Sequence, residues 1–277
     1  MKKVIKALAL TGGVLCAVRG LDNRLEITHY TIESSKIPKQ FDGYRIVQIS
    51  DYHCDSMPGL ANEIRNEAPD LIVSTGDLVH DHGSYAPALH LTERLVQIAP
   101  VYMITGNHDV WRSDYHKLER ELMELGANML HNERVFLKRD GAQIALTGID
   151  DPFAVDSDRI RKAVQGALEK VPPYEGYDIL LFHRANLLDQ VKRHGFELIL
   201  AGHMHGGQFR LPGVGGFVSP KSSLGSNTHL FFPKYFGGYY KSDDTDMIVN
   251  RGLGNPMFVP RVFNRPELVT VTLKHQS

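Results

Sequence analysis

The sequence predicts an α/β protein in which much of the sheet is covered on both faces. Short apolar runs alternate with stretches of helical period from about residue 25 onward, which is typical of strands connected by helices. The apolar runs are nearly continuous, as in strands that are buried on both sides. Polar residues follow five of these runs directly, at the position where ligands bind in open α/β sheets.

The expected strands are short apolar runs, of which RIVQIS, LIVST and VYMIT are the first three. In chain order they occupy residues 45–50, 71–75, 101–105, 143–149, 179–182, 198–201, 247–250 and 268–273. Stretches of helical period separate them and predict helices at residues 60–67, 85–98, 114–125, 157–171 and 185–194. Residues 206–238 are rich in Gly, Pro, Ser and Phe, which predicts a long loop with short strands.

The length and charge of the chain favour one globular domain without a nucleic-acid partner. A chain of 277 residues can bury a sizeable core, and we expect a single domain at residues 25–277. The 31 Lys and Arg residues nearly balance the 32 Asp and Glu residues, so no overall field attracts a polyanion. An anionic substrate would therefore have to be held by local contacts.

Residues 1–20 have the layout of a signal peptide or a membrane anchor. Lys2, Lys3 and Lys6 precede an apolar run at residues 7–18, which is short for a span of about 20 residues. Arg19 interrupts any small-x-small cleavage site. We therefore expect a membrane-associated or exported protein with a soluble domain. An amphipathic or frayed terminus, and a cytoplasmic location, are the alternative.

Side chains that bind metal ions follow five of the predicted strands. In chain order they are Asp51 and His53, Asp77, then Asn107, His108 and Asp109, then His183, and finally His203 and His205. With His108 and Asp109 set aside, seven candidate ligands remain, which is too many for one ion and suits two ions that share a carboxylate. Mixed nitrogen and oxygen donors without thiolate favour Mn, Fe or Zn. Gly76, Gly106 and Gly202 each precede a candidate ligand, where glycine lets the backbone approach closely.

The ordered motifs DYH, GD, GNHD, a lone His and GHMH resemble the calcineurin-like metallophosphoesterase superfamily. The flanking segments IPKQFDGYRIVQISDYH, GIDDP, HGGQ and NRGLG are similar to the bacterial branch of YkuE- and YaeI-type phosphoesterases. The resemblance covers the chain from about residue 28 onward. It implies an α/β/β/α sandwich with two central mixed sheets and a metal site at the carboxyl ends of the strands.

The resemblance also implies a role for each candidate residue. One ion would be held by Asp51, His53 and His205, the other by Asn107, His183 and His203, and both by Asp77. The implied reaction is hydrolysis of a phosphodiester, phosphomonoester or pyrophosphate bond by a hydroxide held between two divalent ions. The substrate would be a phosphorylated small molecule or a lipid-linked compound of the cell envelope.

Four residues would assist the reaction implied by the resemblance. His108 would stabilise the transition state or protonate the leaving oxygen, with Asp109 orienting its ring. The amide of Asn107 and the guanidinium of Arg184 would bind the substrate phosphate. The alternative for Arg184 is that it points away from the site to a carboxylate at the surface.

Two alternative hypotheses concern the function of the chain: a non-catalytic module and a different class of enzyme. A non-catalytic metal-binding or scaffold module would share the fold, but it would need neither His108 nor the full ligand set. Motifs of nucleotide-binding oxidoreductases, P-loop proteins and serine hydrolases do not occur in the sequence. Cys54, next to the DYH motif, is expected to be a small buried hydrophobe rather than an additional ligand.

Overall fold

Two six-stranded mixed sheets form the centre of the computed structural model, which describes residues 18–152, 156–220, 231–255 and 259–277. The first sheet contains, in spatial order, β1 (Glu26–Ser34), β14 (Glu267–His275), β2 (Arg45–Ile49), β3 (Leu71–Ser74), β4 (Val101–Met103) and β5 (Asn128–Met129). The second contains β12 (Gly238–Ser242), β13 (Thr245–Val249), β9 (Leu198–Gly202), β8 (Asp178–Arg184), β7 (Ala142–Ile149) and β6 (Glu133–Arg139). A small additional sheet pairs β10 (Arg210–Leu211) with β11 (Gly215–Gly216).

The central strands of each sheet run parallel to one another. In the first sheet β2, β3, β4 and β5 are parallel, and in the second β7, β8, β9 and β13 are parallel. Antiparallel pairs occur between β14 and β2, between β12 and β13, and between β6 and β7. The carboxyl ends of parallel strands meet at one edge of their sheet, so the loops that follow them are neighbours.

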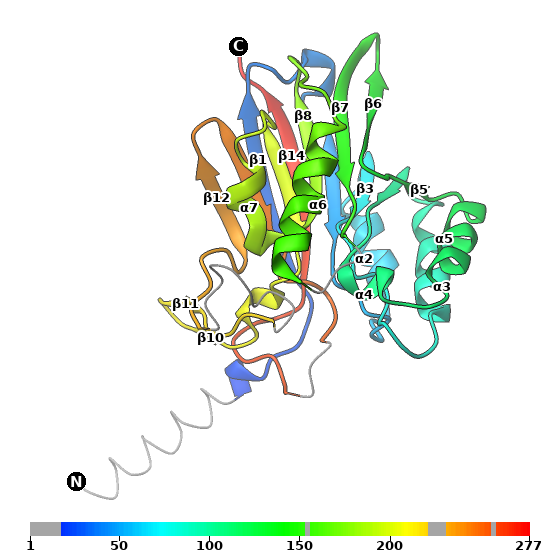
Figure 1. Cartoon of the computed structure of the whole chain (residues 1–277), viewed down its shortest axis with the longest axis vertical. Helices are drawn as coiled ribbons and strands as arrows, with labels where there is room; N and C mark the ends of the chain where they lie inside the picture. The colour runs from blue at the N-terminus through cyan, green and yellow to red at the C-terminus, as the bar shows by residue number, and fades with distance from the viewer. Residues whose placement is uncertain (1–17, 153–155, 221–230, 256–258) are drawn as a thin grey trace, which may run out of the picture.

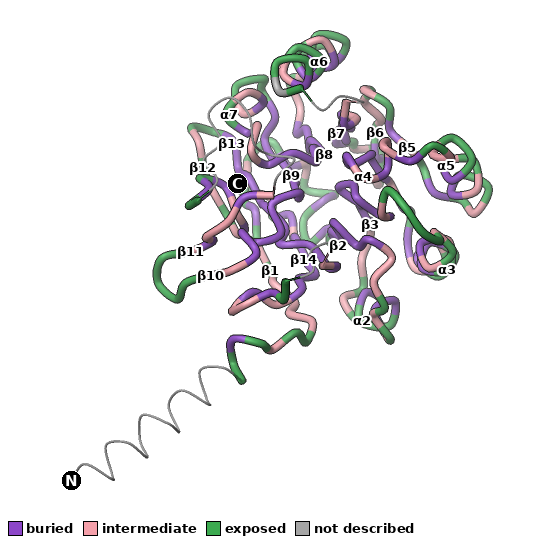
Figure 2. The backbone as a smooth tube through the Cα atoms, turned by 60° about the horizontal axis from the view of Figure 1, so that its bottom comes forward, coloured by how far each residue is buried: buried purple, intermediate pink, exposed green. Residues whose placement is uncertain are grey.

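Helices cover the outer face of each sheet. Figure 2 shows α2 (Leu60–Asn66), α3 (Ala86–Leu95) and α5 (Tyr115–Glu124) on one side of the molecule, with α6 (Ser157–Glu169) and α7 (Leu188–Val191) on another. The short helix α4 (Asn107–Val110) follows β4 directly, and three 3-10 turns are η1 (Lys39–Phe41), η2 (Ala185–Leu187) and η3 (His205–Gly207). The layers are therefore helix, sheet, sheet and helix, as Figure 1 also illustrates.

Three apolar layers hold these elements together. Along β2, Ile46 packs in the layer between the sheets, whereas Val47 and Ile49 pack against the helices of the first sheet. Successive side chains of a strand point to opposite faces, so a strand buried on both sides must be apolar throughout. A third layer joins α6 and α7 to the second sheet through residues such as Val164 and Leu180. The predicted α/β/β/α sandwich is confirmed.

The structure contains more strands than the sequence predicts. All eight predicted strands are present, and the short strands β10 and β11 lie in the loop predicted to carry them, but β1, β5, β6 and β12 were not expected. The helix predicted at residues 185–194 is shorter, since it consists of η2 and α7.

The signal-like segment expected at residues 1–20 lies almost entirely outside the described residues, which begin at residue 18. Of the helices that the structure does describe, none has the length and apolar composition needed to cross a bilayer.

Candidate metal centre

Loops from both sheets bring the seven candidate ligands to one place. In the first sheet, Asp51 and His53 follow β2, Asp77 follows β3, and Asn107 begins α4 after β4; in the second, His183 belongs to β8, and His203 and His205 follow β9. All seven are buried, with no more than 5% of any residue exposed. The register between β8 and β9 shifts at His183, and such a bulge re-aims a side chain.

One group of donors consists of Asp51, His53, Asp77 and His205, whose nearest ligand atoms all lie within 4.8 Å of one another. The Nε2 atom of His205 is 3.3 Å from Oδ1 of Asp51 and 3.3 Å from Nε2 of His53. Converging imidazole nitrogens and carboxylate oxygens at this spacing have the composition of a transition-metal site.

A second group consists of Asp77, His183 and His203, also within 4.8 Å of one another. The Nε2 atom of His183 lies 3.3 Å from Oδ2 of Asp77 and 3.2 Å from Nδ1 of His203. The same nitrogen is 3.3 Å from Oδ1 of Asn107, so the amide oxygen faces this group. The Nδ2 atom of Asn107 is buried and, among the described residues, has no hydrogen-bond partner.

Asp77 joins the two groups through one oxygen atom. Its Oδ2 lies 3.8 Å from Nε2 of His53 in the first group and 3.3 Å from Nε2 of His183 in the second. Its Oδ1 accepts a hydrogen bond of 2.7 Å from the backbone N–H of His108. A carboxylate between two sets of donors has the position that a bridging ligand requires.

Hydrogen bonds behind the ligands fix the direction of their donor atoms. The Nδ1–H of His183 donates to the carbonyl of Thr75 at 2.7 Å, which fixes the ring with its Nε2 atom facing the site. The carboxylate of Asp51 accepts hydrogen bonds from the Ser50 hydroxyl at 2.5 Å and from the backbone N–H of His203 at 3.0 Å. These contacts hold donors of both sheets in place.

The backbone is strained at most of the ligand positions. Five of the seven have a left-handed φ, namely Asp51 (50°), His53 (50°), Asp77 (51°), His203 (74°) and His205 (45°). This region costs a residue other than glycine roughly 1–2 kcal/mol. Strain of this kind persists where the surrounding structure imposes it, and it clusters at functional sites.

Glycines allow the loops to approach one another, as the sequence predicts. Gly76 has a φ of 92°, and a Cβ atom there would lie 2.8 Å from Nδ1 of His183. A Cβ atom on Gly202 would overlap the Ser50 hydroxyl and lie 2.5 Å from Oδ2 of Asp51. A side chain at either position would push the two sheets' loops apart.

Burial perturbs the ionisation of the ligands. It raises the pKa of Asp51 to about 6 and lowers the pKa of His53 to about 3. It also holds the pKa values of His203 and His205 well below 6.5. For His183 the effect of burial is outweighed by the carboxylates of Asp77, Asp51 and Asp151 together, so the pKa of His183 rises to about 10. Because their pKa values are lowered, His53, His203 and His205 are neutral and offer nitrogen lone pairs, and beside the Asp51 and Asp77 carboxylates this donor set fits divalent cations.

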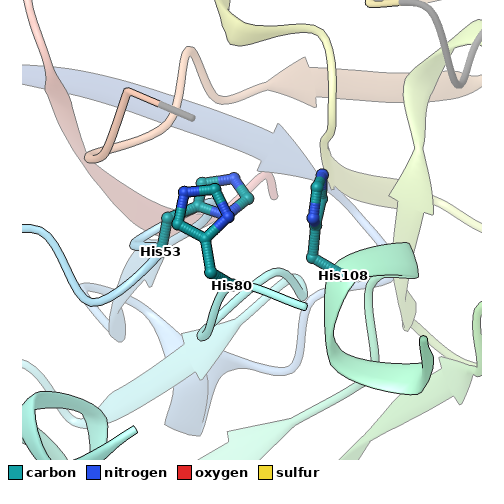
Figure 3. Close-up of side chains that lie close together, drawn as sticks. All are labelled: His53, His80 and His108. Carbon is teal, nitrogen blue, oxygen red and sulfur yellow. The ribbon is translucent and has the colours of Figure 1, made fainter. Parts of the chain in front are cut away.

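His80 and His108 lie beside the candidate ligand His53, as Figure 3 shows. The ring of His53 lies 4.9 Å from that of His108 and 4.8 Å from that of His80. His80 was not recognised from the sequence, because it lies further along the loop after β3 than Asp77 does and belongs to none of the recognised motifs. Arg261 was also missed; its Nη2 lies 3.3 Å from Nδ1 of His205.

The expected contact between Asp109 and the His108 ring does not occur. The carboxylate of Asp109 accepts hydrogen bonds from the backbone N–H groups of Gly106 at 2.8 Å and Val79 at 3.1 Å. It thereby caps the first turn of α4 instead of reaching the ring. The ring of His108 instead approaches the carboxylate of Asp81, whose Oδ1 is 3.6 Å from Nδ1 of His108.

Arg184, the expected phosphate clamp, lies in a buried ion pair with Asp151. Its side chain is 2% exposed, with Nε 2.6 Å from Oδ2 of Asp151 and Nη2 2.9 Å from Oδ1. Burial raises the pKa of Asp151 despite this partner. Arg184 thus has a carboxylate partner, as in the alternative expectation, but the pair is buried rather than at the surface.

A four-layer sandwich with clustered His, Asp and Asn side chains at its strand ends defines a metallophosphoesterase. The chain belongs to the calcineurin-like phosphoesterase family, whose sequence model matches residues 44–207. The enzyme class follows from this membership: the protein is a metal-dependent phosphoric ester hydrolase.

Relatives from bacteria and vertebrates agree with this assignment. The uncharacterized metallophosphoesterase YkuE of Bacillus subtilis is 30% identical, with 96% of this chain and 94% of that protein covered. The phosphodiesterase YaeI of Escherichia coli is 25% identical over 75% of this chain and 71% of that protein. The transmembrane protein with metallophosphoesterase domain of Danio rerio is 28% identical over 99% of this chain, which spans 63% of that protein.

Proposed function

We propose that the protein is a dinuclear phosphoesterase that hydrolyses a phosphodiester, phosphomonoester or pyrophosphate bond, with residues 25–277 as its catalytic domain. The observation that carries this proposal is the position of Asp77, whose Oδ2 faces donors of both groups. The extent of the domain is supported by β1, which pairs with β14 along nine residues, and by the ligands that both sheets contribute.

The ligand roles follow from the two groups. We assign Asp51, His53 and His205 to one ion, Asn107, His183 and His203 to the other, and Asp77 to both. Mn, Fe or Zn ions held by these residues would supply Lewis acidity, which lowers the pKa of water and offsets the negative charge of phosphoryl oxygens. The absence of a thiolate from the seven assigned residues suits these metals.

The protein's own side chains bind and orient the substrate. The Nδ2 group of Asn107 is a buried donor without a protein partner among the described residues, and it would donate to a phosphate oxygen. His108 is 22% exposed at the rim, where its ring can give a proton to the leaving oxygen. Asp109 acts as a positioning residue, because it holds the turn that carries both side chains.

The first twenty residues would place this domain at a membrane or in the cell envelope. Their basic start and apolar run support this location, and the Danio rerio relative is named as a transmembrane protein. A phosphorylated or lipid-linked compound of the envelope is the corresponding substrate. Fractionation of cells that express the full chain, compared with residues 21–277 alone, tests the role of the segment; equal distribution of both would contradict it.

The decisive test of the enzyme is substitution of the shared carboxylate. Asp77→Asn should lower bound metal and reduce hydrolysis of a chromogenic phosphodiester by more than about 100-fold, since even partners behind a ligand contribute 10–100-fold. Asp244→Asn, in the exposed turn between β12 and β13, is the matched control and should change neither quantity. Full metal content and full activity in Asp77→Asn would overturn the proposal.

A further inference from the structure

His131 lies in the connection by which the chain passes from the first sheet to the second. The strand β5 ends at Met129 and β6 begins at Glu133, so residues 130–132 join the two sheets. The helix α5, which precedes β5, packs in the apolar layer that covers the first sheet. A residue of this connection that contacts both α5 and the second sheet would therefore link the two sheets.

Each ring nitrogen of His131 meets a carboxylate. Its Nε2 atom is 3.0 Å from Oε1 of Glu119 on α5, and its Nδ1 atom is 3.0 Å from Oδ2 of Asp150, which follows β7 of the second sheet. An ionised carboxylate only accepts hydrogen bonds, and a neutral imidazole has a single ring N–H. Both contacts can be hydrogen bonds only when the ring carries two protons, so this geometry favours the imidazolium form.

Other donors hold the two carboxylates in place. The Oε1 atom of Glu119 also accepts a hydrogen bond of 2.5 Å from the Tyr115 hydroxyl. The Oδ1 atom of Asp150 accepts one of 3.0 Å from the hydroxyl of Thr105, and the backbone N–H of Asp150 donates to the Asn132 side chain at 3.1 Å. Neither carboxylate can turn away without losing these bonds, so loss of one ring proton would leave a nitrogen lone pair facing an oxygen atom.

The other charged groups around the ring are mostly acidic. Glu133 of β6 accepts the backbone N–H of His131 at 3.3 Å, whereas His116 of α5 approaches the second oxygen of Glu119 at 3.6 Å. The hydrogen bond to Asp150, followed by the charges of Asp150, Glu119 and Glu133, raises the pKa of His131 above 6.5 against the opposing effect of partial burial. The resulting stability is fully present below pH 6.5 and is lost as the pH rises through the raised value.

We propose that His131 is a pH-sensitive link, which ties α5 to the turn after β7, and so the first sheet to the second, while its ring is protonated. Deprotonation breaks one of the two ties. None of the seven residues assigned to the metal ions belongs to this link, so the inference goes beyond the proposed reaction and does not depend on it.

Urea unfolding at several pH values tests the link. The full-length wild type and His131→Gln are compared between about pH 6 and pH 10, and the titration of the metal ligands cancels in the ratio because both proteins share them. At the acidic end the unfolding constant of the variant should be roughly 3- to 30-fold larger, as expected for the loss of two partly exposed ion pairs. The ratio should fall towards one as the pH rises above 6.5. A ratio that does not change with pH would overturn the link.

His116→Gln is the matched control. The ring of His116 is 85% exposed and approaches the same Glu119 with only one nitrogen, at 3.6 Å. The unfolding constant of this variant should therefore stay close to that of the wild type at every pH. A pH dependence as large as that of His131→Gln would show that any histidine near Glu119 has the effect, and it would overturn the double contact as the cause.

The titration of the His131 ring is a second test, which does not require His131→Gln to fold. In NMR spectra of the wild type with isotope-labelled histidine, the ring resonance of His131 should titrate with a midpoint above 6.5. Asp150→Asn removes one of the two charged partners and should lower that midpoint, and the resonance that it moves most identifies the ring. A midpoint at or below 6.5, or one that Asp150→Asn leaves unchanged, would overturn the link. Neither measurement uses hydrolysis, so the proposed enzyme is tested separately.

Discussion

The Oδ2 atom of Asp77 lies 3.3 Å from Nε2 of His183, although Asp77 follows a strand of one sheet and His183 belongs to the other. The contact is possible because β3 ends where β8 has a bulge, so both side chains turn into the same space. Catalysis at this site would therefore depend on how the two sheets are packed, and on the turns that carry the ligands.

Replacing His108 by alanine should remove acid catalysis while leaving the two assigned metal sites filled. Proton transfer by a positioned side chain contributes about 10²–10⁴-fold, and the benefit is greatest when the leaving group is a poor one. We expect a loss of that size for an alkyl ester and a smaller loss for a nitrophenyl ester. An equal loss for both esters, measured as kcat, would show that His108 has another role.

Gly76→Ala should destabilise the protein more than an alanine at another left-handed glycine. The added Cβ would lie 2.6 Å from the backbone nitrogen of Gly106 and 2.8 Å from Nδ1 of His183. Gly141, with a φ of 81° and open space around it, is the matched control for the backbone strain alone. We expect about 1–2 kcal/mol for Gly141→Ala and about 1–3 kcal/mol beyond that for Gly76→Ala. Urea unfolding of both variants provides the comparison, and equal midpoints would contradict the steric account.

Cys54 should react slowly with alkylating reagents until the solution is strongly alkaline. Burial raises the pKa of the Cys54 thiol from 9.0 to about 11. The thiolate is the reactive form, so at pH 9 about 1% of the folded protein would carry it, compared with about half of an unperturbed thiol. Alkylation by iodoacetamide, followed in a Cys16→Ser background, should accelerate towards pH 11. A rate that levels off near pH 9 would contradict the raised pKa.

Breaking the buried pair of Arg184 and Asp151 should lower stability rather than substrate affinity. Arg184→Met would leave the Asp151 carboxylate buried without its charged partner, which typically costs about 3–5 kcal/mol. Arg184→Met/Asp151→Asn should recover part of that loss, because the uncompensated charge is removed. Thermal unfolding and inhibition by inorganic phosphate are the two measurements. If stability were unchanged and inhibition by phosphate weaker, Arg184 would be a phosphate-binding residue instead.

Strands buried on both faces could be predicted from the sequence, whereas strands at the sheet edges could not. The run at β2 carries apolar side chains on both faces, with Ile46 on one and Val47 and Ile49 on the other, so its pattern could be recognised despite the buried Gln48. By contrast β1, with the sequence EITHYTIES, leaves one side partly exposed and pairs with β14 alone. The edge strands β6 and β12 carry polar residues for the same reason. Their assignment depends on pairing with distant partners, which local patterns do not contain.

The candidate ligands were predictable because each directly follows, or ends, a buried strand. The hydrogen-bond partners of two nearby charged residues could not be predicted. Asp109 contacts Val79, 30 residues away in sequence, and Arg184 contacts Asp151, 33 residues away. His80 had no such signal either, because its significance lies in the side chains of His53 and His108 that surround it.

The donors of the metal centre come from loops of both sheets, and this has a consequence for the cohesion of the protein. Ions bound there would link the two sheets, and each would add RT ln(1 + [M]/Kd) to the free energy of unfolding. Stripping the metal should thus speed amide hydrogen exchange first in the turns after β3 and β9, before the opposite ends of the same strands respond. The bound cations would therefore stabilise the packing of the two sheets as well as take part in catalysis.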